Sequence, residues 1–205
     1  MALFITFEGG EGCGKSVQTK TLYKRLSELA IPVVLTHEPG GTPLGDNISR
    51  WLKWTQGTDI PPLTELLLFN ASRAQLVTEV IKPSLGSGQI VICDRFADST
   101  TVYQGYGRGL EMDMVKAINN AATQGIKPQL TVLLDIPAEA GLARKQTGKQ
   151  DRFEKEDVTF HEKVRQGYLK LATEEPERWL VIDATQSKEQ IADIIWQKVR
   201  QLLSG

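Results

Sequence analysis

The feature that most constrains this chain is a glycine-rich stretch near its start, Gly9-Gly10-Glu11-Gly12-Cys13-Gly14-Lys15-Ser16. Its spacing (a glycine, four residues, then Gly-Lys-Ser) is typical of loops that bind the phosphates of nucleoside triphosphates. A short apolar segment over 3–7 precedes it and predicts a β-strand, while apolar residues at helical spacing over 16–30 predict a helix. This order matters because the glycines let backbone N–H groups turn toward phosphate oxygens, and the helix presents its positive end to the same anion.

Two side chains at the end of the loop complete this prediction. Lys15 can reach the β- and γ-phosphates, and the hydroxyl of Ser16 can coordinate Mg²⁺. The alternative, a chance glycine turn before a helix, does not explain why a strand and a helix flank the turn in the required order. The loop therefore predicts binding of a nucleoside triphosphate, but it does not say what happens to the γ-phosphate.

Composition narrows the class of protein. The chain has 205 residues, 40% of them apolar and 24% charged, which predicts one globular domain over 1–205. The net charge of −1 gives no overall basic field, so we expect no nucleic-acid partner. No segment approaches the roughly 18 apolar residues of a membrane span, and the first residues do not resemble a signal peptide. Cys13 and Cys93 suggest neither a disulfide framework nor a metal site, which favours the cytoplasm.

Strand and helix patterns alternate along the chain. Strands are predicted over 3–7, 32–36, 89–93, 130–136 and 179–182, and helices over 16–30, 44–53, 63–82, 113–124, 137–145, 159–174 and 188–203. Pro83 is expected to end the third of these helices, His161 to lie on the surface and Trp196 in the core. Such alternation predicts an α/β fold with a parallel sheet, whose ligands bind at the carboxyl ends of the strands. The segments 8–16, 37–42 and 94–108 all follow predicted strands.

A second group of polar residues follows the third predicted strand. Asp94 at the strand end can hold Mg²⁺, and the guanidinium of Arg95 can grip phosphate oxygens with its fork of donors. Serine, threonine, tyrosine and glutamine side chains over 99–104 supply hydrogen bonds of the kind that recognise a base and a sugar. Taken alone, Asp94 and Arg95 could be a surface ion pair. Together with the phosphate loop upstream and the polar run downstream, they favour a nucleotide site.

The chain resembles the thymidylate kinase family in five motifs, which occur in order over nearly its whole length. They are 7–16, Glu38-Pro39-Gly40-Gly41-Thr42, Phe69-x-x-x-Arg73, 92–104 and Ile182-Asp183-Ala184-Thr185. The resemblance implies the reaction ATP + dTMP → ADP + dTDP with Mg²⁺. It also implies a five-stranded parallel sheet flanked by helices, a small lid, and a homodimer.

The resemblance assigns roles at the base of dTMP. Phe69 is similar to the aromatic residue that stacks on thymine, and Arg73, one helical turn later, resembles the arginine that donates to a thymine carbonyl. Ser99, Thr100 and Gln104 resemble the remaining residues that recognise the base. Two alternatives stay open from the sequence: Phe69 could be a core residue of its helix, and Arg73 a solvated charge.

Further roles concern the sugar and the phosphate. Tyr103 resembles the aromatic residue under the sugar that disfavours a 2′-hydroxyl, although it could simply pack between elements. Glu11 is similar to the loop carboxylate near the 3′-hydroxyl, the alternative being an exposed loop residue. Arg95 resembles the arginine that holds the acceptor phosphate, and Pro39 and His37 are expected beside dTMP.

The resemblance also predicts where ATP binds and which charges act on it. The expected ATP contacts are Gly9, Gly10, Glu11, Gly12, Cys13, Gly14, Lys15, Ser16, Val17, Arg144 and Asp183. The expected metal ligands are Ser16 and Asp94, and the expected catalytic cations are Lys15, Arg95, Arg144 and Arg152. No strong general base is expected, because the acceptor phosphate is itself the nucleophile.

The sequence departs from the family pattern in the segment over about 144–153, the predicted lid. Some thymidylate kinases carry a catalytic arginine in the phosphate loop, but this chain has Gly12 there, which shifts that task to the lid. The lid has only Arg144 and Arg152, with Lys145 and Lys149 between them, and lysine lacks the guanidinium fork. Arg144 could instead lie against adenine, and the whole segment could be a solvated basic loop.

A second departure is His37, where the family commonly has an arginine that helps to hold the dTMP phosphate. Histidine is shorter and is charged only part of the time near neutrality. We therefore expect weaker acceptor-phosphate binding, partly recovered below about pH 6.5.

Three other interpretations were weighed against this one. A GTP-dependent switch protein would need an Asn/Thr-Lys-x-Asp motif, and Gly148-Lys149-Gln150-Asp151 lacks its first side chain. Another nucleotide or nucleoside kinase could use the same scaffold. A non-catalytic nucleotide-binding module is disfavoured by the intact Lys15 and Arg95.

Overall fold

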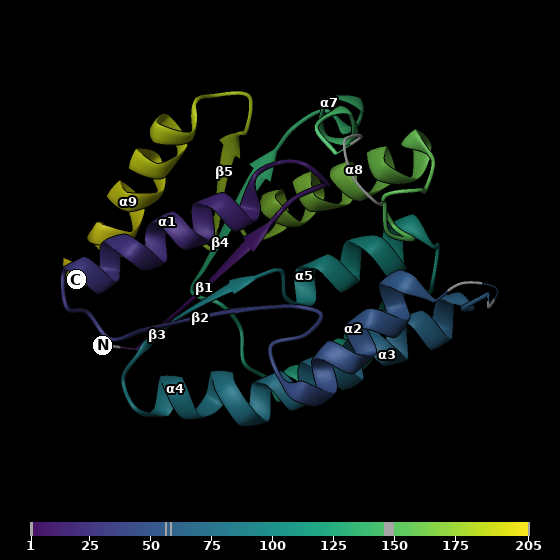
Figure 1. Ribbon diagram of the computed structural model, residues 1–205, viewed down its shortest axis with the longest axis horizontal. Coiled ribbons are helices and arrows are strands. Elements are labelled where there is room, and N and C mark those ends of the chain that lie inside the picture. Colours follow the sequence, from purple (N-terminus) through teal and green to yellow (C-terminus); the bar gives the residue numbers. More distant parts are fainter. Residues whose placement is uncertain (1, 56, 58, 146–149, 205) are drawn as a thin grey trace.

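A computed structural model describes residues 2–55, 57, 59–145 and 150–204 of the chain. Its five strands form one parallel sheet in the order β2-β3-β1-β4-β5 (Figure 1). The strands are β1 (Leu3–Glu8), β2 (Val33–His37), β3 (Ile90–Asp94), β4 (Leu130–Asp135) and β5 (Trp179–Asp183). The predicted five-stranded parallel α/β sheet is therefore confirmed.

Helices cover both faces of the sheet. The α-helices are α1 (Lys15–Glu28), α2 (Pro43–Trp54), α3 (Pro62–Leu76), α4 (Lys82–Gly86), α5 (Ala97–Thr100), α6 (Met112–Thr123), α7 (Ala138–Ala143), α8 (Val158–Glu174) and α9 (Lys188–Ser204). Helices α1 and α9 lie together on one face, and α3 to α6 and α8 lie on the other (Figure 1). None of the helices in the described part of the chain is long and apolar enough to span a membrane.

The two faces follow from alternation along β1, the central strand. Ile5 and Phe7 pack into the cluster beneath α1 and α9, whereas Phe4 belongs to the cluster beneath α3 and α4. Because β1 is buried on both faces, its sequence is an almost unbroken apolar run, as a central parallel strand requires. The strand therefore holds the phosphate loop at its carboxyl end on a rigid support.

Strand register brings the predicted functional segments to one edge. Asp94 pairs with Phe7 on one side and with His37 on the other, so three strand ends meet there. Asp135 likewise pairs with Asp183. Three side-chain caps fix where helices begin at this edge: Thr42 accepts from the Gly45 N–H, Glu111 caps α6, and Asp157 caps α8.

Two helical regions differ from the sequence prediction. Pro83 does not end a helix: α3 continues through a π-helix over Val77–Ile81 into α4, and Pro83 lies in the first turn of α4, where its missing N–H is tolerated. The segment after β3, to which the sequence pattern assigns no helix, forms α5 and a second π-helix, η2 (Thr101–Gly107). This wide turn carries Tyr103 and Gln104.

The prediction for His161 is wrong, and that for Trp196 holds in part. His161 is only 3% exposed and packs edge-on against Phe160, because its position on α8 faces the sheet rather than solvent. Trp196 is half-buried at the edge of the core, with the guanidinium of Arg25 4.4 Å from the centre of its ring.

Candidate active site

The phosphate loop is seated directly against α7. Gly12 has a φ of +67°, and a Cβ atom at this position would lie 2.0 Å from the carbonyl oxygen of Gly141. A Cβ atom on Gly141 would in turn lie 2.3 Å from the carbonyl oxygen of Glu11. Backbone atoms cannot yield as a flexible side chain can, so neither position has room for a side chain. The glycine at the position of the expected loop arginine is thus a packing requirement of this structure.

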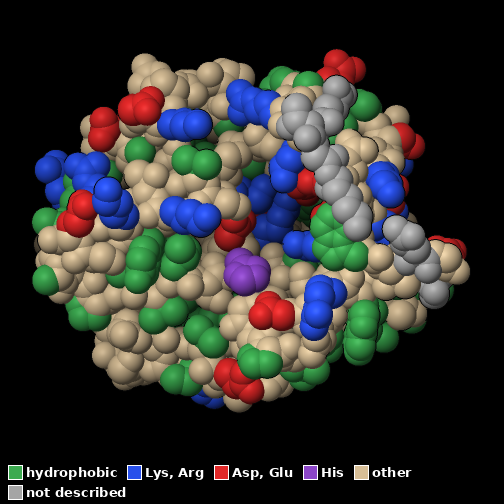
Figure 2. Space-filling view, viewed as in Figure 1, with side chains coloured by type: hydrophobic (Ala, Val, Ile, Leu, Met, Phe, Trp, Pro, Cys, Tyr) green, Lys and Arg blue, Asp and Glu red, His purple; other side chains and the backbone are tan. Residues whose placement is uncertain are grey.

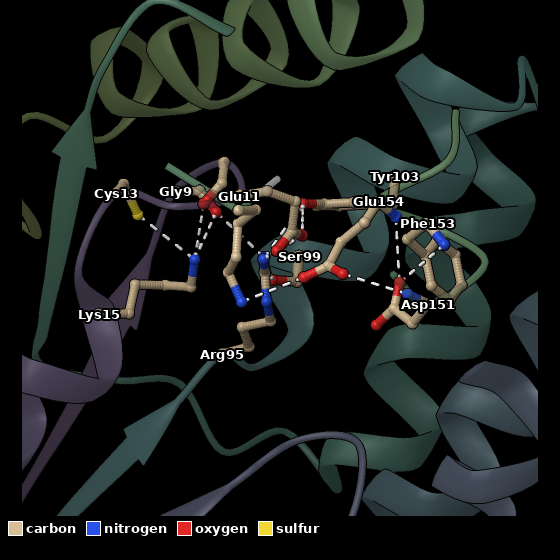
Figure 3. A network of polar contacts seen from close by, with 12 residues as sticks. Gly9, Glu11, Cys13, Lys15, Arg95, Ser99, Tyr103, Asp151, Phe153 and Glu154 are labelled. Atoms are coloured by element: carbon tan, nitrogen blue, oxygen red, sulfur yellow. Dashed lines mark hydrogen bonds and ion pairs between the residues drawn. The ribbon is translucent and has the colours of Figure 1, made fainter. Parts of the chain in front are cut away.

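Lys15 points back along the loop. Its ammonium donates hydrogen bonds to the carbonyl oxygens of Gly9 (3.0 Å) and Gly10 (2.8 Å), and to the Sγ atom of Cys13 (3.3 Å), as Figure 3 shows. The side chain is buried, and it lines the larger cavity of the site. Its charge is therefore held over the loop, where the phosphates of a nucleoside triphosphate would lie.

Two cavities adjoin at this edge of the sheet. The larger is bordered by the loop and α1, including Gly12, Gly14, Lys15, Ser16 and Val17. The smaller is bordered by aromatic and polar side chains: Pro39, Phe69, Arg73, Phe96, Ser99, Thr100, Tyr103, Gln104 and Phe153. Lys and Arg side chains gather in a hollow on this face of the molecule (Figure 2).

Five residues line both cavities and so mark their junction: Glu11, Glu38, Lys53, Arg95 and Asp151. Arg95 stands at the end of β3 with a φ of +70°. Its guanidinium donates to the carboxylate of Glu11 at 2.7 Å and to the hydroxyl of Tyr103 at 3.2 Å (Figure 3). It also donates to the carbonyl oxygen of Gly9. An arginine fork is thus held rigidly where the two cavities meet.

The electrostatics of Glu11 reflect this contact. Burial alone would raise the pKa of Glu11, but the guanidinium of Arg95 and the ammonium of Lys15 lower it to about 2. The hydroxyl of Tyr103 adds a hydrogen bond of 2.8 Å to the same carboxylate. Glu11 is therefore an anion at every physiological pH.

A second carboxylate, Glu8, lies beneath Arg95 and has no solvent exposure. It accepts hydrogen bonds from the Phe96 N–H (2.8 Å), the Ser99 hydroxyl (2.6 Å) and the Tyr168 hydroxyl (2.9 Å). Burial, with the nearby charge of Asp98, raises the pKa of Glu8 to about 7. Sequence reasoning missed this network, because Tyr168 comes from α8, far along the chain.

The smaller cavity has aromatic walls. The rings of Phe69 and Phe153 have centroids 5.6 Å apart, and Tyr103 lies 6.1 Å from Phe153. Phe69 is half-buried; it lines the cavity and also packs against the core cluster that includes Tyr103 and Phe160. Phe153 was not predicted, since it lies in a segment that is otherwise polar.

Gln104 presents one defined end of its amide to this cavity. Its side-chain nitrogen donates to the carboxylate of Glu65 at 2.6 Å, and a carboxylate accepts hydrogen bonds only. The amide oxygen must therefore point the other way, and it has no hydrogen-bond partner among the described residues. Gln104 is fully buried yet lines the cavity, so it offers an unpaired acceptor there.

Arg73 is buried rather than solvated, at 1% exposure. It lies 2.8 Å from Glu38, also donates to the hydroxyl of Thr100 at 2.8 Å, and is held by two asparagines, Asn70 and Asn119. Its remaining N–H, at 3.3 Å from the Phe96 carbonyl oxygen, makes the longest bond. All five donors thus have protein acceptors, and a bond to a bound base would replace or share one of them.

Ser16 and Asp94, the two predicted metal ligands, are in contact. The Ser16 hydroxyl donates to Asp94 Oδ2 at 2.6 Å, and both residues line the larger cavity. Hard oxygen donors of this kind fit Mg²⁺, which commonly keeps several waters and takes few protein ligands. The described residues contain no group of three His, Cys, Asp or Glu side chains that could form a larger metal site.

The predicted lid residues lie in two different places in the structure. Arg144 and Lys145 line the larger cavity, and Arg144 lies 3.4 Å from the Gly12 carbonyl oxygen. Arg152 is bound instead to Glu65 and to the carbonyl oxygen of Leu52, and it lines neither cavity. Lys149 and the rest of 146–149 lie outside the described residues.

The surroundings of three other predicted contact residues differ from one another. Asp183 is exposed and lines neither cavity; it accepts from the Thr185 N–H. Cys13 is buried within the loop. His37 lines the larger cavity only, with its side chain 58% exposed and its Nε2 3.8 Å from Asp46.

Comparisons with known proteins agree with this geometry. Among sequence models of known families, the thymidylate kinase family matches residues 7–195. A thymidylate kinase of Dehalococcoides mccartyi is 55% identical over 203 residues, covering 99% of this chain and 98% of that protein. One of Geobacter sulfurreducens is 47% identical, covering 97% and 99%. The crystal structure of thymidylate kinase from Ehrlichia chaffeensis superposes with a TM-score of 0.79 at 35% identity, covering 97% of this chain and 98% of that one.

Proposed function

The chain belongs to the thymidylate kinase family and transfers a phosphoryl group from ATP to dTMP, and we propose that its two cavities divide the substrates between them. The smaller cavity would hold dTMP, and the larger would hold the phosphates of ATP. The observation that carries this proposal is the junction, where Arg95 and Glu11 line both cavities. The acceptor phosphate and the γ-phosphate would meet there.

In this proposal Arg95 positions the acceptor phosphate. The transfer needs no strong base, since the acceptor oxygen is already an anion; it needs two mutually repelling phosphates held in line. Five protein contacts to the Arg95 guanidinium fix its orientation before substrate binds. A fork held in this way can neutralise charge in the transition state without reorganising.

Lys15 and the loop N–H groups would act on the donor side. The Lys15 ammonium is now bonded to loop carbonyl oxygens and would exchange those bonds for oxygens of the β- and γ-phosphates. Mg²⁺ held by Ser16 and Asp94 would supply further neutralisation of phosphate charge. Arg144 and Lys145 would add positive charge from the α7 side of the cavity, and Gly12 and Val17 would border the bound nucleotide.

The base would be recognised in the smaller cavity. Thymine carries an N3–H donor, and the unpaired amide oxygen of Gln104 is an acceptor that suits it. Phe69 would stack on the ring, and Arg73 would face a thymine carbonyl. A hydrogen bond from Arg73 to this carbonyl would replace or share either its longest bond, to the Phe96 carbonyl oxygen, or its bond to the Thr100 hydroxyl. Tyr103, whose hydroxyl is bonded to Glu11, would lie beneath the sugar, with Ser99 and Pro39 completing the wall.

We also propose a homodimer that works in the cytoplasm. An apolar surface on α2 and α3 supports the dimer: Leu44, Trp51, Leu63 and Leu67 are each 45–57% exposed, and the two helices pack side by side. The two free cysteines are consistent with a reducing compartment. Light scattering on a Trp51→Glu variant tests the dimer, which should dissociate to a monomer.

The acceptor specificity is tested with a panel of dTMP, dUMP, dCMP, dGMP and thymidine, each incubated with ATP and Mg²⁺. Formation of ADP with dTMP well above the other acceptors is the expected result. Phosphorylation of thymidine but not dTMP would contradict the proposed division of the site, because the acceptor oxygen would then be a sugar hydroxyl.

A further inference from the structure

Lys53, in the last turn of α2, has no role in the site as described so far. We propose that the ammonium of Lys53 binds the phosphate group of the acceptor nucleotide, an inference that rests on the proposed function of the smaller cavity. Lys53 contributes to the walls of both cavities. Apart from Arg95, it is the one cationic residue among the described residues that does so.

The backbone at Lys53 is bonded to Arg152. The Lys53 carbonyl oxygen accepts from the Arg152 N–H at 3.2 Å, and the neighbouring Leu52 carbonyl oxygen accepts from Arg152 Nε at 3.0 Å. These bonds join the end of α2 to Arg152. The Lys53 side chain is half-buried and lines both cavities.

Charge compensation distinguishes Lys53 from its neighbours. Arg95 is paired with Glu11 at 2.7 Å, and Arg73 is paired with Glu38 at 2.8 Å. Across the described part of the chain, the Lys53 ammonium forms no hydrogen bond or ion pair. Its positive charge interacts electrostatically with Asp151. A dianionic phosphate entering the junction would meet Glu11 and Glu38, each paired with an arginine, and Lys53, which interacts electrostatically with the third carboxylate of the junction, Asp151.

The side chain of His37 does not occupy the same position. His37 is confined to the larger cavity, is mostly exposed, and faces Asp46. A flexible lysine stem can extend its charge over several ångströms, whereas the histidine ring cannot cross to the smaller cavity. Lys53 thus supplies positive charge where the geometry of His37 does not.

The test compares dTMP with thymidine, which lacks the phosphate, by calorimetric titration of the nucleotide-free enzyme. In Lys53→Met the dissociation constant for dTMP should rise roughly ten- to hundredfold, as expected for losing a hydrogen bond between charged groups. The constant for thymidine should stay unchanged, and Lys53→Arg should restore dTMP binding. Arg50→Met is the matched control, since Arg50 is an exposed cation on the same helix that lines neither cavity.

Two results would overturn the inference. If dTMP and thymidine weaken together, Lys53 supports the shape of the base cavity and not the phosphate; if neither weakens, it makes no contact with the nucleotide. Failure of the proposed function is seen separately, as a wild-type enzyme that shows no ATP-dependent turnover of dTMP.

Discussion

Arg95 at the end of β3 and Glu11 in the phosphate loop form an ion pair of 2.7 Å, so the loop that would hold ATP also orients the arginine that would face dTMP. Both side chains are mostly buried, and Tyr103 bonds to each of them. The two substrate positions are therefore coupled by one rigid contact. A change in either residue should affect the alignment of donor and acceptor more than the binding of either one.

Replacing Arg95 with lysine tests whether the fork matters beyond its charge. Arg95→Lys keeps a cation but cannot span Glu11, Tyr103 and the Gly9 carbonyl oxygen together. We expect kcat to fall roughly hundredfold with a smaller change in the KM for ATP. Steady-state kinetics measure this, with the melting temperature as a check on folding. A kcat near the wild-type value would show that charge alone is sufficient.

Gln104→Leu tests the unpaired amide oxygen in the base cavity. The variant removes the acceptor while Glu65 keeps its bonds to Arg108. We expect dTMP binding to weaken roughly tenfold. N3-methyl-dTMP, which has no N3–H, is the matched ligand: wild type should reject it, and the variant should bind both nucleotides about equally. Unchanged discrimination in Gln104→Leu would place the base in a different orientation.

Arg73→Met should destabilise the fold as well as the base site. It leaves the Glu38 carboxylate buried without its partner, which costs about 3–5 kcal/mol of unfolding free energy at neutral pH. Burial raises the pKa of Glu38 to about 7 even with Arg73 present, so protonation can relieve this cost in acid. Denaturant unfolding should show a smaller loss at pH 5 than at pH 8. The double variant Arg73→Met/Glu38→Gln should recover part of the stability; equal losses at both pH values would contradict the explanation.

Gly12→Ala tests the contact between the loop and α7. The added methyl group would lie 2.0 Å from the Gly141 carbonyl oxygen, so the loop must shift. A shift of about 1 Å can cost roughly a hundredfold in rate, and we expect kcat/KM for ATP to fall by that order. Gly10→Ala is the control, because a Cβ atom there meets nothing within 4 Å. Similar activity in both variants would mean that the contact is not restrictive.

His161→Phe should flatten the dependence of stability on pH. Burial lowers the pKa of His161 in the folded protein, and this effect outweighs the opposite effects of the Glu11 carboxylate and the Phe153 backbone. The unfolded chain therefore binds a proton at a higher pH than the folded one. The stability that follows is present above about pH 6.5 and is lost as the pH falls toward the lower folded value.

Urea unfolding at intervals from pH 8 to pH 5 measures this slope. His161→Phe should remove part of it, because the variant has no group at this position that the unfolded chain can protonate. Parallel curves for wild type and His161→Phe would locate the acid sensitivity elsewhere.

The sequence by itself was sufficient for the fold and for the grouping of the loop and strand-end residues at one edge of the sheet. Three local patterns in the sequence predicted them: the glycine loop between a strand and a helix, the alternation of strands with helices, and the polar residues that directly follow strands. Because parallel strands end at one edge, Lys15, Ser16, Asp94 and Arg95 could be placed together without any knowledge of packing. The resemblance to a known family then added the roles of Phe69, Tyr103 and Gln104.

Only the tertiary structure decided which side chains meet across distant segments. The burial of His161, the pairing of Arg152 with Glu65 and the end of α2, the Gly12–Gly141 contact and the position of Lys53 at the junction depend on how helices pack on the sheet. A single sequence shows the hydrophobic period of each helix and strand, but not the angle at which the element packs on its neighbours or how deeply its side chains are buried. Packing at interior density fixes those quantities, and with them the direction in which each polar atom points.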